Sequence, residues 1–307
     1  MNFIGSIFGY VLWLAYQLVH NYALAIFIFT IIAKVVLFPS SVKQQKTMAG
    51  NARLQAKQAE LREKYGNNRE KLNEETQKLY EKEGVSPYSG CFSTIIPMFI
   101  MIGVFYAVAY PLTNTLHLEQ SMVNEAKNVL VSIPGINISA SSMYGGQIDI
   151  LKYFNAFPCI QECFAGANHS ISTISAFCSA FNLSGFNLLE TPKEYGFFSL
   201  YILIPVLCFV TSVFSQLFMQ KLNGTSNAAN QQGCMKFMII ALPLFSAYIA
   251  YTVPAAVGFY WICSTVLGFV QSVIMFKFFG PAMTVARSEA ARVALLEKQE
   301  AMVKRLR

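Results

Sequence analysis

Five long apolar runs limit what this chain can fold into more than any other feature of its sequence. A helix that crosses the hydrocarbon of a bilayer needs about 17–25 predominantly apolar residues. We place such segments at residues 21–40, 89–112, 196–221, 234–252 and 254–279. Only 13% of the residues are charged, whereas a soluble domain usually carries about 25%. The sequence therefore predicts an all-α membrane protein with five transmembrane helices.

Basic residues are concentrated in two of the connecting segments. Ser40–Pro87 holds 10 Lys and Arg and Lys277–Arg307 holds 7, whereas the longer Pro111–Gly196 holds 3. Because cytoplasmic segments carry the excess of basic residues, the first two segments are expected in the cytoplasm and the third outside. Five spans then place the N-terminus outside and the C-terminus in the cytoplasm.

Residues 1–20 are apolar at helical spacing, and no Lys or Arg precedes Lys34. A standard secretory signal peptide begins with basic residues, so this segment does not read as one. We expect an interfacial N-terminal helix on the outer leaflet. An extension of the first span is the alternative.

The segment 113–195 is expected to be an extracytoplasmic insertion, with helices at Gln120–Pro134 and Tyr144–Phe157. A disulfide persists in such a compartment. We expect one disulfide among three cysteines: Cys159, Cys163 and Cys178. A zinc site that also uses His169 is the alternative, and its ligand spacing is poor.

The segment 41–88 changes to a charged, helical pattern. Gly66–Asn68 divides it into two halves as a turn, and the acid-to-base pairs Glu60–Lys64 and Glu74–Lys78 support one helix in each half. The sequence predicts a cytoplasmic two-helix hairpin that moves relative to the membrane part, because its apolar seam is thin. The seam is represented by Leu54, Tyr65, Leu72 and Tyr80. A solvated charged loop that only enforces topology is the alternative.

Lys34 lies inside the first apolar run. A charge at the membrane centre costs at least ~2.5–3.5 kcal/mol on insertion scales, so its surroundings need an explanation. Its side chain either extends about 9 Å to the cytoplasmic interface or faces a polar cavity. The residues alone leave these two interpretations open.

Polar side chains form one stripe on the third predicted span and one on the fifth. Gln is costly in lipid, so these stripes are expected to face other helices or water. Packing of helices through small residues is the alternative. With Lys34, the candidate groove residues are Ser212, Ser215, Gln216, Met219, Tyr260, Trp261, Thr265 and Gln271.

Three segments carry a resemblance to a known family. They are Asn21–Met48, Val253–Ser272 and Leu54–Phe99, the last of which contains KYGNNREKLNEETQKLYEKEGVSPYSGC. The chain resembles the YidC-type membrane protein insertases, except over roughly Thr113–Leu183. The resemblance implies five membrane helices around a hydrophilic groove that is open to the cytoplasm and to lipid and closed to the outside. A polar segment of a nascent membrane protein would enter this groove and leave sideways into the bilayer.

The resemblance also assigns a place to Lys34. In the family a single positive residue on the first core span lies in the groove, and Lys34 stands at the matching position. The family residue is usually arginine. Lysine, unlike arginine, can lose its proton when buried, so the departure leaves the charge state of the site open.

The expected function is that of a membrane protein insertase and chaperone in the bacterial cell membrane, with no catalytic residue, metal or cofactor. Nascent membrane proteins and membrane lipid are the expected partners, and DNA is not. The ribosome, the signal-recognition machinery and the Sec translocon are further candidates, since the tail 280–307 is a basic amphipathic helix suited to RNA or anionic lipid. A small-solute channel or transporter and a ribosome-tethering protein are the alternative functions.

Overall fold

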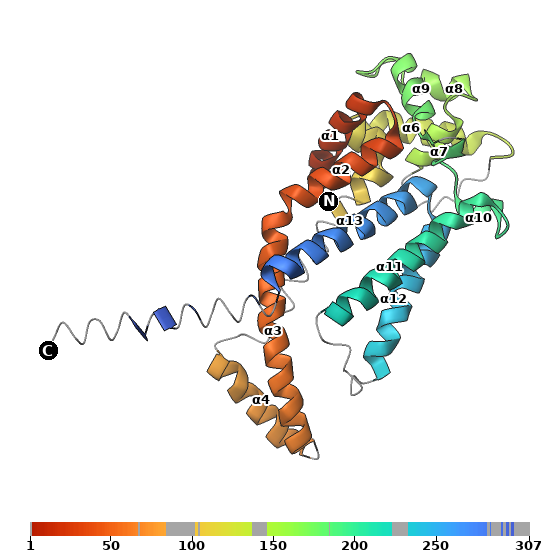
Figure 1. Cartoon of the computed structure of the whole chain (residues 1–307). Coiled ribbons are helices and arrows are strands. Elements are labelled where there is room, and N and C mark those ends of the chain that lie inside the picture. The colour runs from red at the N-terminus through yellow and green to blue at the C-terminus, as the bar shows by residue number, and fades with distance from the viewer. Residues whose placement is uncertain are drawn as a thin grey trace. The chain divides into compact units, whose positions relative to one another are not determined.

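The computed structural model describes residues 2–66, 68–83, 102–103, 105–136, 146–183, 185–222 and 233–280, with isolated positions between 283 and 297 (Figure 1). The chain divides into two compact units. The first comprises Met1–Val35, Phe99–Phe218 and Asn227–Phe269, and the second comprises Val36–Met98, Met219–Ser226 and Val270–Arg307. The tail 280–307 lies almost entirely outside the described residues, so its expected helix is not observed.

The apolar helices are α1 (Asn2–Val19), α2 (Tyr22–Val36), α11 (Leu203–Leu222), α12 (Gly233–Thr252) and α13 (Ala255–Phe279). Two segments, Leu200–Leu222 and Ala255–Phe278, are each long and apolar enough to cross a membrane, as expected for the third and fifth spans. A third candidate is the bent pair Tyr22–Val36 and Phe38–Gln45, if the pair counts as one span.

The remaining two predicted spans are less fully represented. Within α12, Ile240–Thr252 qualifies as a shorter apolar helix. Most of the segment 89–112 lies outside the described residues. The protein is therefore mostly helical with two or three membrane-length helices in its described part, and the five-span core stays a prediction.

The break between α1 and α2 is local. His20 has a φ of 49°, which ends α1 in the left-handed region. The Oδ1 atom of Asn21 accepts a hydrogen bond from the backbone N of Leu24 at 3.2 Å, an N-cap for α2. The N-terminal segment is thus a separate helix rather than a continuation of α2. Its position at the membrane interface stays a prediction.

A close backbone approach holds α1 against η1, the π-helix Pro111–Thr115. A Cβ atom at Gly9 would overlap the backbone carbonyl of Asn114. The side chain of Asn114 is occupied by a hydrogen bond to the Tyr106 carbonyl oxygen at 2.9 Å. Glycine at position 9 is therefore required by contact distance, not by its own backbone conformation.

The insertion 113–195 is a small folded domain, which we call the inserted domain. Its helices α6 (Gln120–Ser132) and α7 (Gln147–Tyr153) lie where the sequence predicts helices. They are followed by α8 (Pro158–Glu162), α9 (Ile171–Ser179), a two-stranded antiparallel sheet of β1 (Asn182–Leu183) and β2 (Phe186–Asn187), and α10 (Pro192–Tyr195). The 3-10 helix η2 (Leu200–Ile202) then leads into α11.

Aromatic side chains fill the core of this domain. Phe154, Phe164, Phe177 and Phe181 are each at most 1% exposed. The Phe177 and Phe181 rings also pack edge-to-face, with their centroids 5.3 Å apart. Cys159, Cys163 and Cys178 are free thiols, so the expected disulfide is absent: Cys178 is buried in this core, whereas Cys159 is exposed.

In the second unit, α3 (Phe38–Tyr65) and α4 (Arg69–Glu83) form the helical hairpin that the sequence predicts (Figure 1). Pro39 stands in the first turn of α3, where a missing N–H costs nothing. Across the hairpin, Gln58 Nε2 donates to the Tyr80 hydroxyl at 2.8 Å. The cytoplasmic location of the hairpin stays a prediction.

The seam of the hairpin is only partly buried. Tyr65, Leu72 and Tyr80 are half-buried, and the side chain of Leu54 lies outside the described part. Lys78 pairs with Glu74 at 2.7 Å, whereas Glu60 and Lys64, both described, form no ion pair.

Candidate substrate groove

Lys34 lies in the last turn of α2, among aliphatic side chains that are exposed. Ile31 and Ile32 are 38% and 39% exposed, and Val35 is 67% exposed, as expected for surface that faces lipid. Lys34 itself is partly buried. A basic residue in the last turn of a helix also interacts favourably with the helix dipole.

The ammonium group of Lys34 lies beside Gly268 on α13. A Cβ atom built on Gly268 would stand 3.1 Å from the Lys34 Nζ atom. A side chain at position 268 would therefore contact the end of the Lys34 side chain, and glycine leaves room for it. In the described part of the chain, Lys34 has no ion-pair partner.

Helix α11 presents two different faces. Val206, Val210, Phe214 and Leu217 are between 48% and 56% exposed and form an apolar stripe. The predicted polar residues Ser212, Ser215 and Gln216 are partly buried on the rest of the helix. The exposed apolar stripe and the partly buried polar residues thus lie on different faces of α11, and the role of the polar residues in a groove stays a prediction.

Two hydroxyl groups on α11 are satisfied by their own helix. Ser215 Oγ donates to the Thr211 carbonyl at 2.7 Å, and Thr211 Oγ1 donates to the Leu207 carbonyl at 2.6 Å. Such back-bonding is the usual state of Ser and Thr inside helices. Among the described residues, no hydrogen bond occupies the Gln216 side chain or links Lys34 to this stripe.

Helix α13 carries the other candidates in different environments. Tyr260 is only 3% exposed and belongs to the core. Trp261 and Thr265 are partly buried, and the Trp261 ring lies 6.4 Å from that of Phe105. Gln271 Nε2 is buried without a hydrogen-bond partner in the described structure, a situation that costs free energy unless water or a ligand satisfies it.

Two glycines on α13 were not predicted as site residues. Gly268 neighbours Lys34, and the signal in the sequence was its position on the polar stripe of the fifth span. Gly258 allows α11 to approach, because a Cβ atom there would overlap Ile204 Cγ2, and the Cys208 thiol lies 3.5 Å from the Gly258 carbonyl. Small residues at such crossings are typical of membrane helices.

Met219 and Gln271 belong to the second unit and the other groove candidates to the first. Within the first unit, Lys34 on α2 and Gly268 on α13 are brought together. The groove itself, as a continuous hydrated space, stays a prediction.

Comparison with known proteins decides the family. The sequence profile of the family described as 60Kd inner membrane protein matches residues 13–281. The chain belongs to this family. The match includes α2, the helical hairpin, the inserted domain, α11, α12 and α13.

Individual relatives carry the name membrane protein insertase YidC. The protein from Geotalea daltonii is 40% identical over 106 residues, 34% of this chain and 19% of the relative. The one from Caulobacter vibrioides is 34% identical over 106 residues, 34% of this chain and 17% of the relative. The one from Francisella philomiragia is 31% identical over 121 residues, 39% of this chain and 21% of the relative. The matched regions thus span between 17% and 21% of the length of these curated relatives.

Proposed function

We propose that this protein is a membrane protein insertase and chaperone, not an enzyme, which moves segments of nascent membrane proteins from the cytoplasm into the bilayer. Membership of the 60Kd inner membrane protein family and the name of its relatives support this function. The single observation that carries the mechanism is the position of the Lys34 ammonium, partly buried beside Gly268 and without a carboxylate partner in the described structure.

An unpaired ammonium in an apolar surrounding is unfavourable, because removing it from water costs several kcal/mol. Water in the groove, or an acidic group of a client, lowers that cost. A client flank that carries Asp or Glu is therefore attracted to Lys34, and the distance that the flank crosses in hydrocarbon becomes shorter. Gln216, which belongs to the same unit as Lys34, supplies a neutral hydrogen-bonding group for the same flank.

Release into lipid follows from the exposed apolar face of α11. A client span that leaves along Val206, Val210 and Phe214 exchanges one apolar surface for another. Each Leu or Ile at the centre of a span contributes about −0.3 to −0.6 kcal/mol on insertion scales. A span of ~20 residues thus supplies its own driving force, and the mechanism needs no nucleotide.

The proposed topology has the N-terminus outside and the C-terminus in the cytoplasm of a bacterial cell. This arrangement places the α3–α4 hairpin and the basic tail on the side from which nascent chains arrive. We assign to them contacts with the ribosome, the signal-recognition machinery or the Sec translocon, on the ground of their excess of basic residues.

Reconstitution in liposomes tests this function. The client is a short single-span protein with an acidic outer flank, and its insertion is measured as protection from added protease. We expect insertion with the wild-type protein and with Lys34→Arg, and a loss of about tenfold or more, equivalent to ~1.4 kcal/mol, with Lys34→Ala.

The matched control is the same client with a neutral flank, whose insertion should depend much less on Lys34. Equal activity of all three proteins on the acidic client would mean that Lys34 does not act in the groove. Absence of insertion by the wild-type protein would contradict the proposed function itself.

A further inference from the structure

A short segment of the inserted domain contacts the N-terminal ends of both helices that meet at Lys34 and Gly268. We call this segment, Ala180–Leu183 and Gly185–Glu190, the strap. It begins at the end of α9, contains both strands of the two-stranded sheet and ends before α10. The function proposed above does not involve it.

The first part of the strap holds α2. The backbone N of Tyr22 donates to the Ala180 carbonyl at 2.9 Å, and Asn21 Nδ2 donates to the Asn182 carbonyl at 3.2 Å. The Tyr22 ring stacks on that of Phe181 with the centroids 4.0 Å apart. The first amides of a helix have no partner in the helix itself, so the strap supplies one that α2 otherwise lacks.

The last part of the strap holds α13 in the same way. The backbone N of Ala255 donates to the Glu190 carbonyl and that of Ala256 to the Leu188 carbonyl, both at 2.8 Å. Ala255 and Ala256 are fully buried. These bonds are therefore protected from competition with water, and losing them would leave buried amides unsatisfied.

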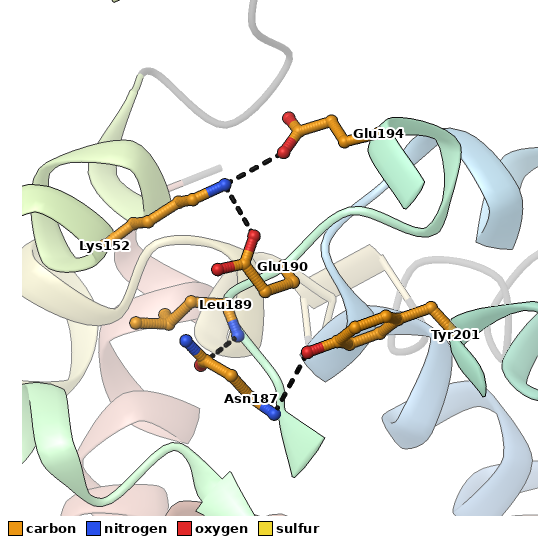
Figure 2. Close-up of polar contacts among 6 residues, drawn as sticks. All are labelled: Lys152, Asn187, Leu189, Glu190, Glu194 and Tyr201. Atoms are coloured by element: carbon orange, nitrogen blue, oxygen red, sulfur yellow. Dashed lines mark hydrogen bonds and ion pairs between the residues drawn. The ribbon is translucent and has the colours of Figure 1, made fainter. Parts of the chain in front are cut away.

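The two parts of the strap are joined to each other. Leu188 N donates to the Phe181 carbonyl at 3.0 Å, and Asn182 pairs with Asn187 in the sheet. The Asn187 backbone N also donates to the Tyr201 hydroxyl at 3.3 Å, which ties the strap to η2 at the start of α11 (Figure 2). Three helices are thus connected at their N-terminal or preceding residues by one segment.

An ion-pair cluster fixes the end of the strap. Lys152 Nζ on α7 lies 2.5 Å from a Glu190 carboxylate oxygen and 2.9 Å from one of Glu194 (Figure 2). Burial alone would lower the pKa of Lys152, but its hydrogen bonds to Glu190 and Glu194 raise it. Lys152 therefore stays charged, and its position couples the body of the inserted domain to the strap.

The strap contacts the N-terminal ends of the two helices, whereas the Lys34–Gly268 contact lies near the C-terminal end of α2 and at the middle of α13. Lys34 follows Tyr22 by 12 residues, and Gly268 follows Ala255 by 13, which correspond to about 18 and 20 Å along the two helices. Since the two offsets are similar, the strap fixes the N-terminal end of a helix pair that meets again at the candidate groove charge, about 18–20 Å further along.

We propose that the strap is the element that keeps the N-terminal ends of α2 and α13 together permanently, and that it thereby supplies in this chain the outer closure that the family resemblance implies for the groove. This inference rests on the proposed function for the meaning of the groove. Its structural part, a fixed barrier at one end of the helix pair, is measurable without any client.

Thiol labelling tests the barrier. Thr265→Cys is introduced into a background whose native cysteines are replaced, and a membrane-impermeant maleimide is added from either side of oriented vesicles. We expect labelling from the cytoplasmic side only. Lys152→Glu, which repels Glu190 and Glu194, should raise the labelling rate from outside by about tenfold or more.

The matched control is the exchange Lys152→Glu with Glu190→Lys, which restores opposite charges and should restore the low labelling rate. Tyr201→Phe is a milder variant that removes one contact of the strap and should give an intermediate rate. An outside rate that is already high in the parent, or that Lys152→Glu leaves unchanged, would overturn the barrier.

A cross-link tests permanence. A disulfide between Asn21→Cys and Asn182→Cys would join α2 to the strap. We expect equal client insertion by the oxidised and reduced forms. If oxidation abolishes insertion and reduction restores it, the strap opens during the cycle and is a gate, not a closure. Failure of the proposed function would abolish insertion in both forms and leave the labelling result intact.

Discussion

The inserted domain and the α3–α4 hairpin use the same interactions at very different degrees of burial. The Lys152–Glu190 pair of the inserted domain has side chains that are 19% and 11% exposed, whereas the Lys78–Glu74 pair of the hairpin is 57% and 63% exposed. Apolar side chains follow the same contrast, since Leu130 of α6 is fully buried and Leu72 of α4 is half-buried.

The inserted domain is therefore held by many buried contacts, whereas the hairpin has few stabilising contacts. Exposed ion pairs contribute little because water and salt screen them, so the hairpin depends on helix propensity and a thin seam. The inserted domain instead has an aromatic core and backbone bonds to α2 and α13. We infer that local opening is cheap in the hairpin and costly in the inserted domain.

The largest expected difference comes from truncating one leucine in each region. Leu130→Ala leaves a cavity in a fully packed site and should cost about 2–5 kcal/mol of unfolding free energy. Leu72→Ala removes a half-buried side chain and should cost roughly 1 kcal/mol. Thermal unfolding of the purified variants in detergent compares the two. Equal losses would mean that the hairpin is as tightly packed as the inserted domain.

The ion pairs provide the next comparison. Lys152→Ala leaves Glu190 without its partner in a mostly buried position and should cost about 2 kcal/mol, below the 3–5 kcal/mol of a completely buried pair. Lys78→Ala should give no measurable change, because its pair is exposed. A double-mutant cycle with Glu190→Gln and Glu74→Gln isolates each coupling. A coupling for Lys78 as large as that for Lys152 would refute the distinction.

Stability should respond to pH in the inserted domain and hardly at all in the hairpin. Burial and then the nearby charge of Glu194 raise the pKa of Asp149 above its ordinary value of 3.8. The folded inserted domain therefore binds this proton more tightly, and it loses stability as the pH rises from 3.8 through the raised pKa. The hydrogen bond from Lys78 lowers the pKa of Glu74 below 4.5, which would favour the folded hairpin above pH 4.5. Because this pair is exposed and screened by water, the hairpin should show no measurable dependence on pH.

Hydrogen exchange measured per peptide between pH 3 and 6 follows both regions in one protein. Asp149→Asn should remove the decrease in protection of the inserted domain, and Glu74→Gln should leave the protection of the hairpin unchanged. If the protection of the inserted domain still decreases with rising pH in Asp149→Asn, another titratable group causes the decrease.

Thiol reactivity gives the smallest effect, confined to the inserted domain. Burial raises the pKa of the Cys178 thiol to about 12, whereas Cys159 is exposed. Because the thiolate is the reactive form, Cys159 should be alkylated well before Cys178 in the folded protein. Mass spectrometry of a time course checks the order, and simultaneous modification would mean that the domain opens readily.

The sequence predicted the features that depend on local pattern. Long apolar runs located α11 and α13, the Gly66–Asn68 turn separated α3 from α4, and Ser, Gln and Lys positions gave the candidate groove residues. Periodicity fixes such features because each involves one helix or one turn.

The features that depend on long-range contact were not predicted. The strap joins residues 180–190 to Tyr22 and Ala255 through backbone groups, and backbone hydrogen bonds leave no residue-specific signal. Gly9 reads as an ordinary helix glycine until a neighbouring segment lies beside it, and the position of Gly268 on the polar stripe of the fifth span does not show its contact with Lys34. The expected disulfide was wrong. The presence of cysteines in an extracytoplasmic segment does not show whether any two of them lie close enough to form a bond.

The most direct test of the central claim, that Lys34 attracts acidic client flanks, is reversal of charge on both partners. Insertion into liposomes is measured for wild type and Lys34→Glu, each with a client whose outer flank carries Asp or Lys. We predict that wild type prefers the client with the Asp flank and that Lys34→Glu prefers the client with the Lys flank. A variant that inserts the Asp flank as well as wild type would contradict it.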